Sequence, residues 1–285
     1  MSGFSAEWLR LREPFDREAR DAAWPALRDA LPRRSGEPMR IVDLGCGTGA
    51  NLRWLAPRLG GVQHWQAIDH DTALLATWPE ALHDWAAAEG HRLRSEGAVL
   101  EVEGEGFLAR VQRRQLDLAA HLDEIPWAEA DLVTAAALID LVSADWLDRL
   151  VAHCRAAGAD VLFTLTVDGR IDWSPADSDD AAVARGFAQH QGRDKGFGPA
   201  LGPDAVAHAV RRLEDGGYDV QQARSDWVAT DRLQLALIDG MVMAAAQQDP
   251  SMQHTVQSWR ERRQALCAGA SLRVGHVDIV ARAAG

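Results

Sequence analysis

Short apolar runs alternate with stretches of helical spacing along most of the chain, and this pattern predicts its strands and helices. Strands are expected at 39–45, 62–69, 130–141 (with its following loop), 159–168, 216–220 and 272–283, together with a hairpin over 98–119 that turns at 104–106. Helices are expected at 5–31, 50–60, 72–89, 144–157, 204–215, 231–248 and 252–266. The alternation of strand and helix is typical of a parallel sheet covered by helices.

The order of these elements predicts a single domain with four parts. Residues 1–38 form a helical N-terminal cap that breaks at Pro32, and residues 39–167 form the core. Residues 168–203 lose the regular rhythm, contain an acidic run and a glycine-rich stretch, and are expected to form a lid. Residues 204–285 then complete the sheet. A chain of 285 residues is near the upper limit for one hydrophobic core.

Composition narrows the class of protein. The chain has 47% apolar and 25% charged residues, as soluble globular proteins do. A net charge of −12 argues against nucleic acid and anionic membranes as partners, because both attract clustered Lys and Arg. Three scattered cysteines and no signal-like or membrane-spanning apolar run favour a reduced, cytoplasmic protein. The histidines and cysteines show no zinc-type ligand pair, so no metal is expected.

The sequence "RIVDLGCGTGANL", residues 40–52, contains the candidate ligand-binding motif. Its glycines at 45, 47 and 49 allow a tight turn with a ligand against the backbone, and Asp69 follows 24 residues after the first glycine. This spacing also satisfies a dinucleotide-binding pattern. Asp43 argues against a dinucleotide, because a carboxylate at the end of the strand would repel a pyrophosphate. A ligand without phosphates and with a positive charge, such as S-adenosylmethionine, fits better.

The motif "VDLGCGTG" resembles the glycine motif of the class I S-adenosylmethionine-dependent methyltransferases. The resemblance implies a mostly parallel, seven-stranded Rossmann-like α/β sheet with an antiparallel last strand. It implies that Asp69 grips the ribose hydroxyls, with His70 beside it, and that Asp117 binds the adenine amino group, with Leu118 beside the ring. Ala135, in the fourth-strand motif, is expected at the methionine end. The implied cofactor residues are Asp43, Gly45, Cys46, Gly47, Thr48, Gly49, Asp69, His70, Asp117, Leu118 and Ala135.

The acceptor is less evident than the donor. The fourth-strand region lacks the Asn-Pro-Pro-Tyr type of run that the family uses for flat amino groups, and this favours a small-molecule acceptor. Two candidates for catalysis are Asp140, which could instead cap the next helix, and His190, which could instead be a surface group. Asp194 and Lys195 lie beside His190 in the expected lid. Arg12, Asp16 and Arg20 share one helical face, either as a polar lid or as a solvated stripe.

The sequence therefore predicts methyl transfer from S-adenosylmethionine to the O, N or C atom of a small molecule. Two alternatives stay open: a protein of the same fold acting on a protein or nucleic acid, and an NAD-dependent oxidoreductase, which Asp43 disfavours.

Overall fold

The computed structural model describes residues 4–31 and 37–283. The strands in these residues are, in chain order, β1 (Met39–Leu44), β2 (Gly61–Asp69), β3 (Arg92–Glu96), β4 (Val99–Gly104), β5 (Phe107–Gln115), β6 (Leu132–Ala136), β7 (Asp160–Ser174), β8 (Asp219–Arg224), β9 (Trp227–Ala229) and β10 (Ser271–Arg282). All belong to one mixed sheet, in the order β3-β4-β5-β2-β1-β6-β7-β10-β8, with β9 paired to β10. The five central strands, from β5 to β7, are parallel, and the strands at both edges are antiparallel.

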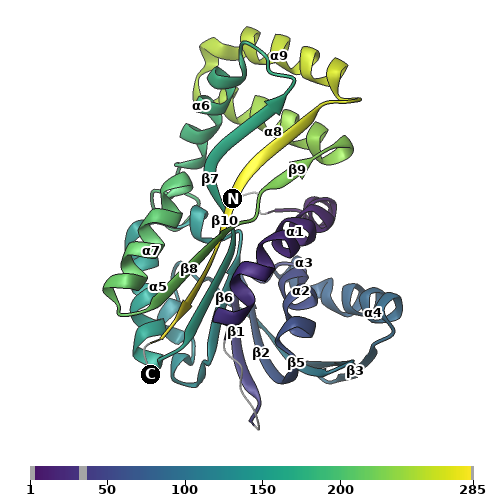
Figure 1. Ribbon diagram of the computed structural model, residues 1–285, viewed down its shortest axis with the longest axis vertical. Coiled ribbons are helices and arrows are strands. Elements are labelled where there is room, and N and C mark those ends of the chain that lie inside the picture. The colour runs from purple at the N-terminus through teal and green to yellow at the C-terminus, as the bar shows by residue number, and fades with distance from the viewer. Residues whose placement is uncertain (1–3, 32–36, 284–285) are drawn as a thin grey trace.

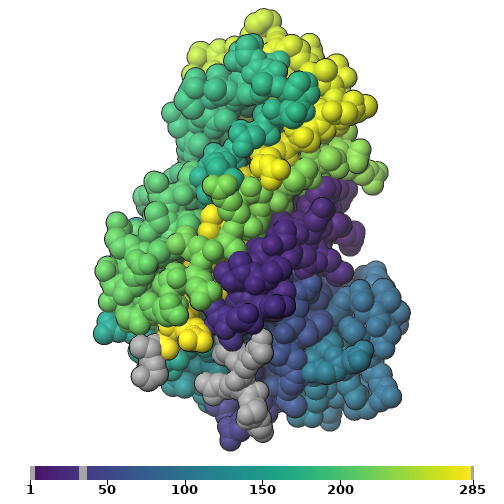
Figure 2. Space-filling view, in the orientation of Figure 1, coloured from purple at the N-terminus to yellow at the C-terminus, as the bar shows by residue number. Residues whose placement is uncertain are grey.

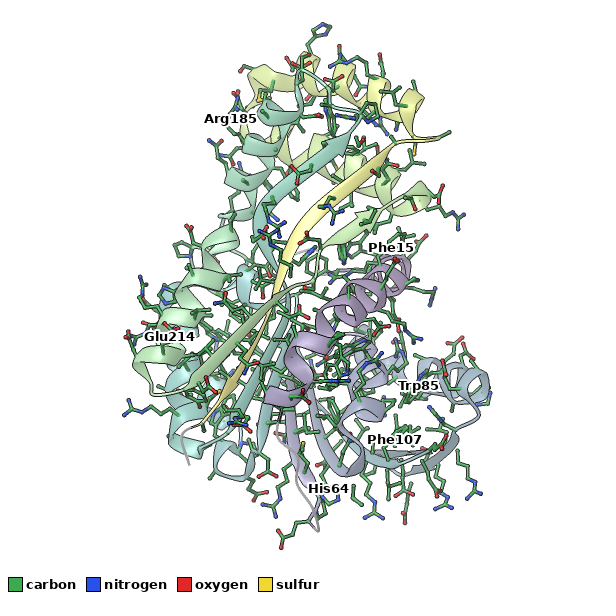
Figure 3. All side chains as sticks on the ribbon, in the orientation of Figure 1. Phe15, His64, Trp85, Phe107, Arg185 and Glu214 are labelled. Atoms are coloured by element: carbon green, nitrogen blue, oxygen red, sulfur yellow. The ribbon has the colours of Figure 1, made fainter. Side chains whose placement is uncertain are left out.

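Helices cover both faces of the parallel part (Figure 1). The helices are α1 (Ala6–Leu27), α2 (Ala50–Leu59), α3 (Thr72–Ala76), α4 (Trp78–Glu89), α5 (Ala144–Ala157), α6 (Asp180–Gln191), α7 (Ala205–Asp215), α8 (Asp231–Gln248) and α9 (Gln253–Leu266). Successive strand residues alternate between the faces, so Ile41 packs in one core with α2 and α4 while Val42 packs in another with α5 and α7. Figure 3 shows Trp85 of α4 and Phe107 of β5 in the first of these cores, with ring centroids 6.1 Å apart.

The predicted α/β fold is confirmed, with more strands than expected. The resemblance implied a sheet of seven strands, and the described residues form ten. Strand β4 belongs to the predicted hairpin about residues 104–106. Strand β3 was not predicted because its sequence, "RLRSE", is mostly polar and lies at the exposed edge. It is held by pairing with β4 and by ion pairs such as Arg94 to Glu101 at 3.3 Å.

The predicted end of the strand at residue 168 is wrong, while the lid over 168–203 stays a prediction. Strand β7 does not end at 168 but continues to Ser174, paired with β10, and α6 follows. Within 168–203, residues 175–179 and 192–201 lack helix or strand. The long ends of β7 and β10 rise above the rest of the sheet, and α6, α8 and α9 surround them as an upper lobe (Figure 1). Trp173 and Trp259 meet edge to face in its core, at 5.6 Å.

Helix α1 lies between the β8 and β9 strands on one side and the α2–β5 region of the parallel sheet on the other. In Figure 2 it is the purple diagonal band that borders both the α2–β5 region and the strands β8 and β9. The predicted break at Pro32 and most of the linker after it lie outside the described residues. Since the parallel strands all end at the edge facing the upper lobe, α1 crosses the place where an α/β sheet binds its ligands.

Candidate functional site

The turn between β1 and α2 has the conformation that its glycines predicted. Gly45, Gly47 and Gly49 have φ angles of 64°, 52° and 83°, in the left-handed region that other residues rarely adopt. A β-carbon at Gly49 would lie 3.0 Å from the ring of Trp78, whose Nε1 donates to the Gly47 carbonyl at 2.8 Å. The turn is therefore rigid, and glycine is required in it by conformation and by space.

Asp69, at the end of β2, holds the turn from below. One carboxylate oxygen accepts the Gly47 N–H at 2.8 Å, and the other accepts the Asp71 N–H at 2.9 Å. The side chain of His70 is exposed, with Nδ1 3.4 Å from Asp69. Asp71 caps α3 by accepting the Ala73 N–H at 2.8 Å. Each oxygen of Asp69 keeps acceptor capacity beyond these bonds, as a ribose ligand requires.

Asp43 is completely buried beside this turn. Its Oδ1 accepts a hydrogen bond from Asn51 Nδ2 at 2.7 Å, whereas its Oδ2 has no partner within the described residues. Burial raises the pKa of Asp43 to about 7, because the charged form loses its hydration. The Asn51 amide oxygen in turn accepts from Arg20 at 2.7 Å. Asn51 was missed in the sequence, although it is the second residue of the helix that follows the glycine motif.

Helix α1 covers the turn and is tied to it by polar contacts. Arg53 of α2 pairs with Glu13, with distances of 3.0 and 2.7 Å, and also donates to the Thr48 carbonyl at 2.7 Å. The guanidinium of Arg20 lies 3.7 Å from the ring centroid of Trp54, and its Nε has no partner within the described residues. The packing is close: a cavity of about 30 Å³ is left beside Arg20 and Trp54, roughly the volume of one water molecule.

Two leucines lie directly on the glycines. A β-carbon at Gly47 would be 3.2 Å from Cδ1 of Leu9, on α1, and one at Gly45 would be 3.3 Å from Cδ1 of Leu138. The backbone before Leu138 is strained, since Ala137 has a φ of 52° and its N–H is bound to the Thr164 carbonyl at 2.8 Å. Such strain in a non-glycine residue is concentrated at functional sites.

The remaining predicted cofactor residues surround the same sheet edge. Asp117 is exposed after β5 and accepts the Ala119 N–H at 2.9 Å, and Leu118 next to it is buried. Ala135 is buried in β6, next to Leu44 in the register. Cys46 and Thr48 are buried in the turn, and burial raises the pKa of the Cys46 thiol well above its ordinary value. The thiol is therefore protonated and unreactive.

Asp140 lies in a single 3₁₀ turn, η4 (Ile139–Leu141), directly after β6. The side chain is buried and its Oδ1 has no partner within the described residues. Burial raises the pKa of Asp140 to about 6, although the charge of Arg12 acts in the opposite direction. The alternative of a helix cap does not hold, because α5 is capped by Ser143, which accepts the Trp146 N–H at 3.3 Å.

Arg12 and Asp16 are buried, so the alternative of a solvated stripe is wrong. They pair at 2.9 Å, and Asp16 accepts a second hydrogen bond from Trp227 Nε1 at 2.9 Å. The guanidinium of Arg12 also lies 5.0 Å from the centroid of the Trp227 ring. Desolvation raises the pKa of Asp16, and the charge of Arg12 acts in the opposite direction. The pair thus connects α1 to β9.

His190, at the end of α6, and two polar residues of the glycine-rich segment that follows it (192–202) do not join this group through their hydrogen bonds. His190 Nε2 is 3.2 Å from the side-chain oxygen of Gln247, on α8. Asp194 accepts the N–H groups of Gly196 and Gly198, and Lys195 donates to the His190 carbonyl at 3.4 Å. These side chains organise the segment and hold it to the upper lobe. A direct role in binding the acceptor stays a prediction.

Within the described residues, no group of three His, Cys, Asp or Glu side chains is arranged to hold a metal ion. In the same residues, no helix is long and apolar enough to cross a membrane.

No protein-family model matches the chain, and no curated protein is significantly similar in sequence. Solved structures do match. A cyclopropane-fatty-acyl-phospholipid synthase-like protein from Lactobacillus casei is 18% identical with a TM-score of 0.53, over 97% of this chain and 94% of that one. Phosphoethanolamine N-methyltransferase 2 of Haemonchus contortus, in complex with S-adenosyl-L-methionine, is 14% identical with a TM-score of 0.44, over 98% of this chain and 58% of that one. Precorrin-6y C5,15-methyltransferase from Geobacter metallireducens is 12% identical with a TM-score of 0.44, over 91% of this chain and 86% of that one.

The chain has the fold of the class I S-adenosylmethionine-dependent methyltransferases, with no subfamily assigned. It spans only 58% of the length of the Haemonchus enzyme. At these identities the likeness extends to the fold alone.

Proposed function

We propose that the chain binds S-adenosylmethionine at the β1–α2 turn and transfers its methyl group to a small-molecule acceptor. The observation that carries this proposal is the buried carboxylate of Asp43, with one oxygen unpaired, next to a turn of three left-handed glycines. An unpaired buried carboxylate favours a cationic ligand and disfavours a pyrophosphate.

The residues around the turn fit each part of this cofactor. Asp69 has acceptor capacity for the ribose hydroxyls, and Asp117 with Leu118 offers an exposed acceptor beside a buried apolar side chain for the adenine. The glycine turn and Ala135 form the surface for the methionine part. When bound, the cofactor supplies a methyl group activated by a positively charged sulfur. The chain's own part is to align the acceptor and to exclude water.

Titration calorimetry with S-adenosylmethionine, S-adenosylhomocysteine and NAD tests the proposal. We expect micromolar binding of the two S-adenosyl ligands and no measurable binding of NAD. Asp69→Ala should weaken both S-adenosyl ligands, whereas Asp84→Ala, at an exposed position on α4, should not. Binding of NAD without binding of either S-adenosyl ligand would instead identify a dinucleotide site.

A further inference from the structure

Asp140 lies where three elements meet. Two residues before it, Leu138 packs on Gly45 of the turn. Two residues after it, the Val142 carbonyl accepts the Leu201 N–H at 2.8 Å, which attaches the glycine-rich segment to the same loop. From α1, the positive charge of Arg12 acts on the Asp140 carboxyl group. Asp140 therefore lies beside the proposed cofactor site and near two elements outside the sheet, namely α1 and the glycine-rich segment.

The Asp140 side chain lacks a partner that its burial requires. It is only 8% exposed, and Oδ1 has no hydrogen bond within the described residues. Arg12 does not supply one: its Nε pairs with Asp16, its guanidinium lies 5.0 Å from the centroid of the Trp227 ring, and Oδ1 has no hydrogen bond to it. An unpaired buried carboxylate is costly, and such exceptions commonly mark a place where a ligand or an ion binds.

The charge around this position is unbalanced. Five buried acidic side chains face two buried guanidiniums at the junction of α1 with the sheet; they are Asp16, Asp43, Asp69, Asp140 and Asp278 against Arg12 and Arg20. Burial raises the pKa of Asp16, Asp43, Asp140 and Asp278 and so favours their neutral forms, whereas a bound cation favours their ionised forms. The other buried guanidiniums, those of Arg53 and Arg263, have carboxylates of their own in Glu13 and Asp180.

His276, near Arg12 on β10, does not add a cation. Burial lowers the pKa of His276 to about 4, so the imidazole is neutral at neutral pH.

S-adenosylmethionine has one net positive charge, from a sulfonium, an ammonium and a carboxylate, and it leaves the junction negative. A second cation is the ligand that this remaining negative charge favours.

We propose that Asp140 binds the methyl-accepting end of the substrate and that this end is an amine, which binds in its protonated form and gives this proton to the Asp140 carboxylate before the neutral nitrogen accepts the methyl group. The inference rests on the proposed function and specifies its acceptor class. The amine donates a hydrogen bond to the free Oδ1, and the carboxylate fixes its position next to the glycine turn. A carboxylate or phosphate at the same end is disfavoured, because it would meet the unbalanced negative charge.

The test uses the full-length protein saturated with S-adenosylhomocysteine, so that no turnover occurs. The probes are propylamine, 2-phenylethylamine and tryptamine, each beside the alcohol and the carboxylic acid of the same skeleton. Binding is measured by saturation-transfer NMR and, where strong enough, by calorimetry. We expect at least one amine to bind, and to bind more tightly than its alcohol and its acid.

Asp140→Asn is the decisive variant, since the amide has nearly the same shape but no charge. It should weaken amine binding by roughly tenfold or more, the effect of losing a charged hydrogen bond, with binding of S-adenosylhomocysteine unchanged. Asp145→Asn, an exposed position on α5, is the matched control and should leave both unchanged. A melting curve shows that each variant is folded.

Two results would overturn the inference while the proposed function stands: S-adenosylhomocysteine binds but no amine is preferred, or Asp140→Asn keeps full amine binding. Failure of the wild-type protein to bind S-adenosylhomocysteine would overturn the proposed function, and this inference with it.

Discussion

The pKa of Asp43 leads to a quantitative prediction about cofactor binding and pH. Burial raises this pKa to about 7, and the nearby charge of Asp69 adds to the effect, whereas the hydrogen bond from Asn51 and the charge of Arg20 oppose it. Only the ionised carboxylate attracts a cationic ligand. If the ligand binds this form alone, its apparent affinity is proportional to the ionised fraction, about 3% at pH 5.5 and about one half at pH 7.0. Affinity for S-adenosylmethionine should therefore rise about 16-fold over this interval, or about 1.6 kcal/mol.

Calorimetry at four pH values between 5.5 and 7.0, at constant ionic strength, measures this slope. Two buffers of different ionisation enthalpy at pH 6.5 then measure the proton released on binding. The α-amino group of the ligand stays largely protonated over this range. Asp43→Asn is the control, because the amide can still meet Asn51 but cannot titrate. His70, the exposed imidazole beside Asp69, is present in both proteins. Equal slopes in the wild type and in Asp43→Asn would refute the reasoning.

The same pKa predicts how the stability of the ligand-free protein changes with pH. Its folded value, about 7, lies above the ordinary value of 3.8, so the folded state binds the Asp43 proton more tightly than the unfolded state does. The contribution of Asp43 to stability is full below about pH 4 and is lost as the pH rises through about 7. The melting temperature of the wild type should thus fall relative to Asp43→Asn between pH 5 and pH 8. A constant difference between the two melting curves would contradict this.

Three further predictions follow from other contacts. Asp69→Ala removes the acceptor of the Gly47 N–H as well as the proposed ribose ligand, so affinity for S-adenosylhomocysteine should fall about ten- to hundredfold; unchanged affinity in a folded variant would exclude the assigned role. Leu9→Ala uncovers Gly47, so stopped-flow association of the same ligand should be several times faster than in Phe4→Ala, which alters an exposed side chain; equal rates would show that Leu9 does not limit access. Arg263→Ala leaves Asp180 without its buried partner and should cost about 3–5 kcal/mol in urea unfolding, clearly more than Arg262→Ala, which alters an exposed side chain; similar costs would show that burial is not the cause.

The parallel core could be predicted because each of its elements is specified locally. The strand at 39–45 is a short apolar run. The helix expected at 144–157 begins after the cap Ser143 and ends at Gly158, which has a φ of 64°. The end of β7 could not be predicted in this way. Its sequence from 168 to 174, "DGRIDWS", is mostly polar, and Trp173 is buried by Trp259, which is distant in sequence. The sequence pattern predicts which face of a strand is buried only when the helices that cover that face lie close by in the chain.

The glycine turn could be predicted for the same reason, since its residues are contiguous. The contacts made by α1 could not. Spacing showed that Arg12, Asp16 and Arg20 share a face of the helix, but not whether that face is in solvent. Their burial depends on Asn51 and on Trp227, the latter 211 residues after Asp16. A helix with charged residues on one face looks the same in the sequence whether that face is solvated or packed on a sheet.

The difference between contiguous motifs and contacts made by distant segments explains why the donor site is easier to identify than the acceptor site. The proposed donor residues lie within a few short segments that end neighbouring strands of the sheet, where strand, turn and helix leave a recognisable pattern. Asp140 meets α1 and the glycine-rich segment only through the fold, and neither has a pattern that specifies its position. The sequence made Asp140 a candidate only by its place after the fourth strand, whereas its burial and its unpaired oxygen belong to the three-dimensional structure. The acceptor class therefore has to be inferred from an unmet hydrogen bond and from an excess of charge, and binding of matched amines, alcohols and acids is the measurement that addresses both.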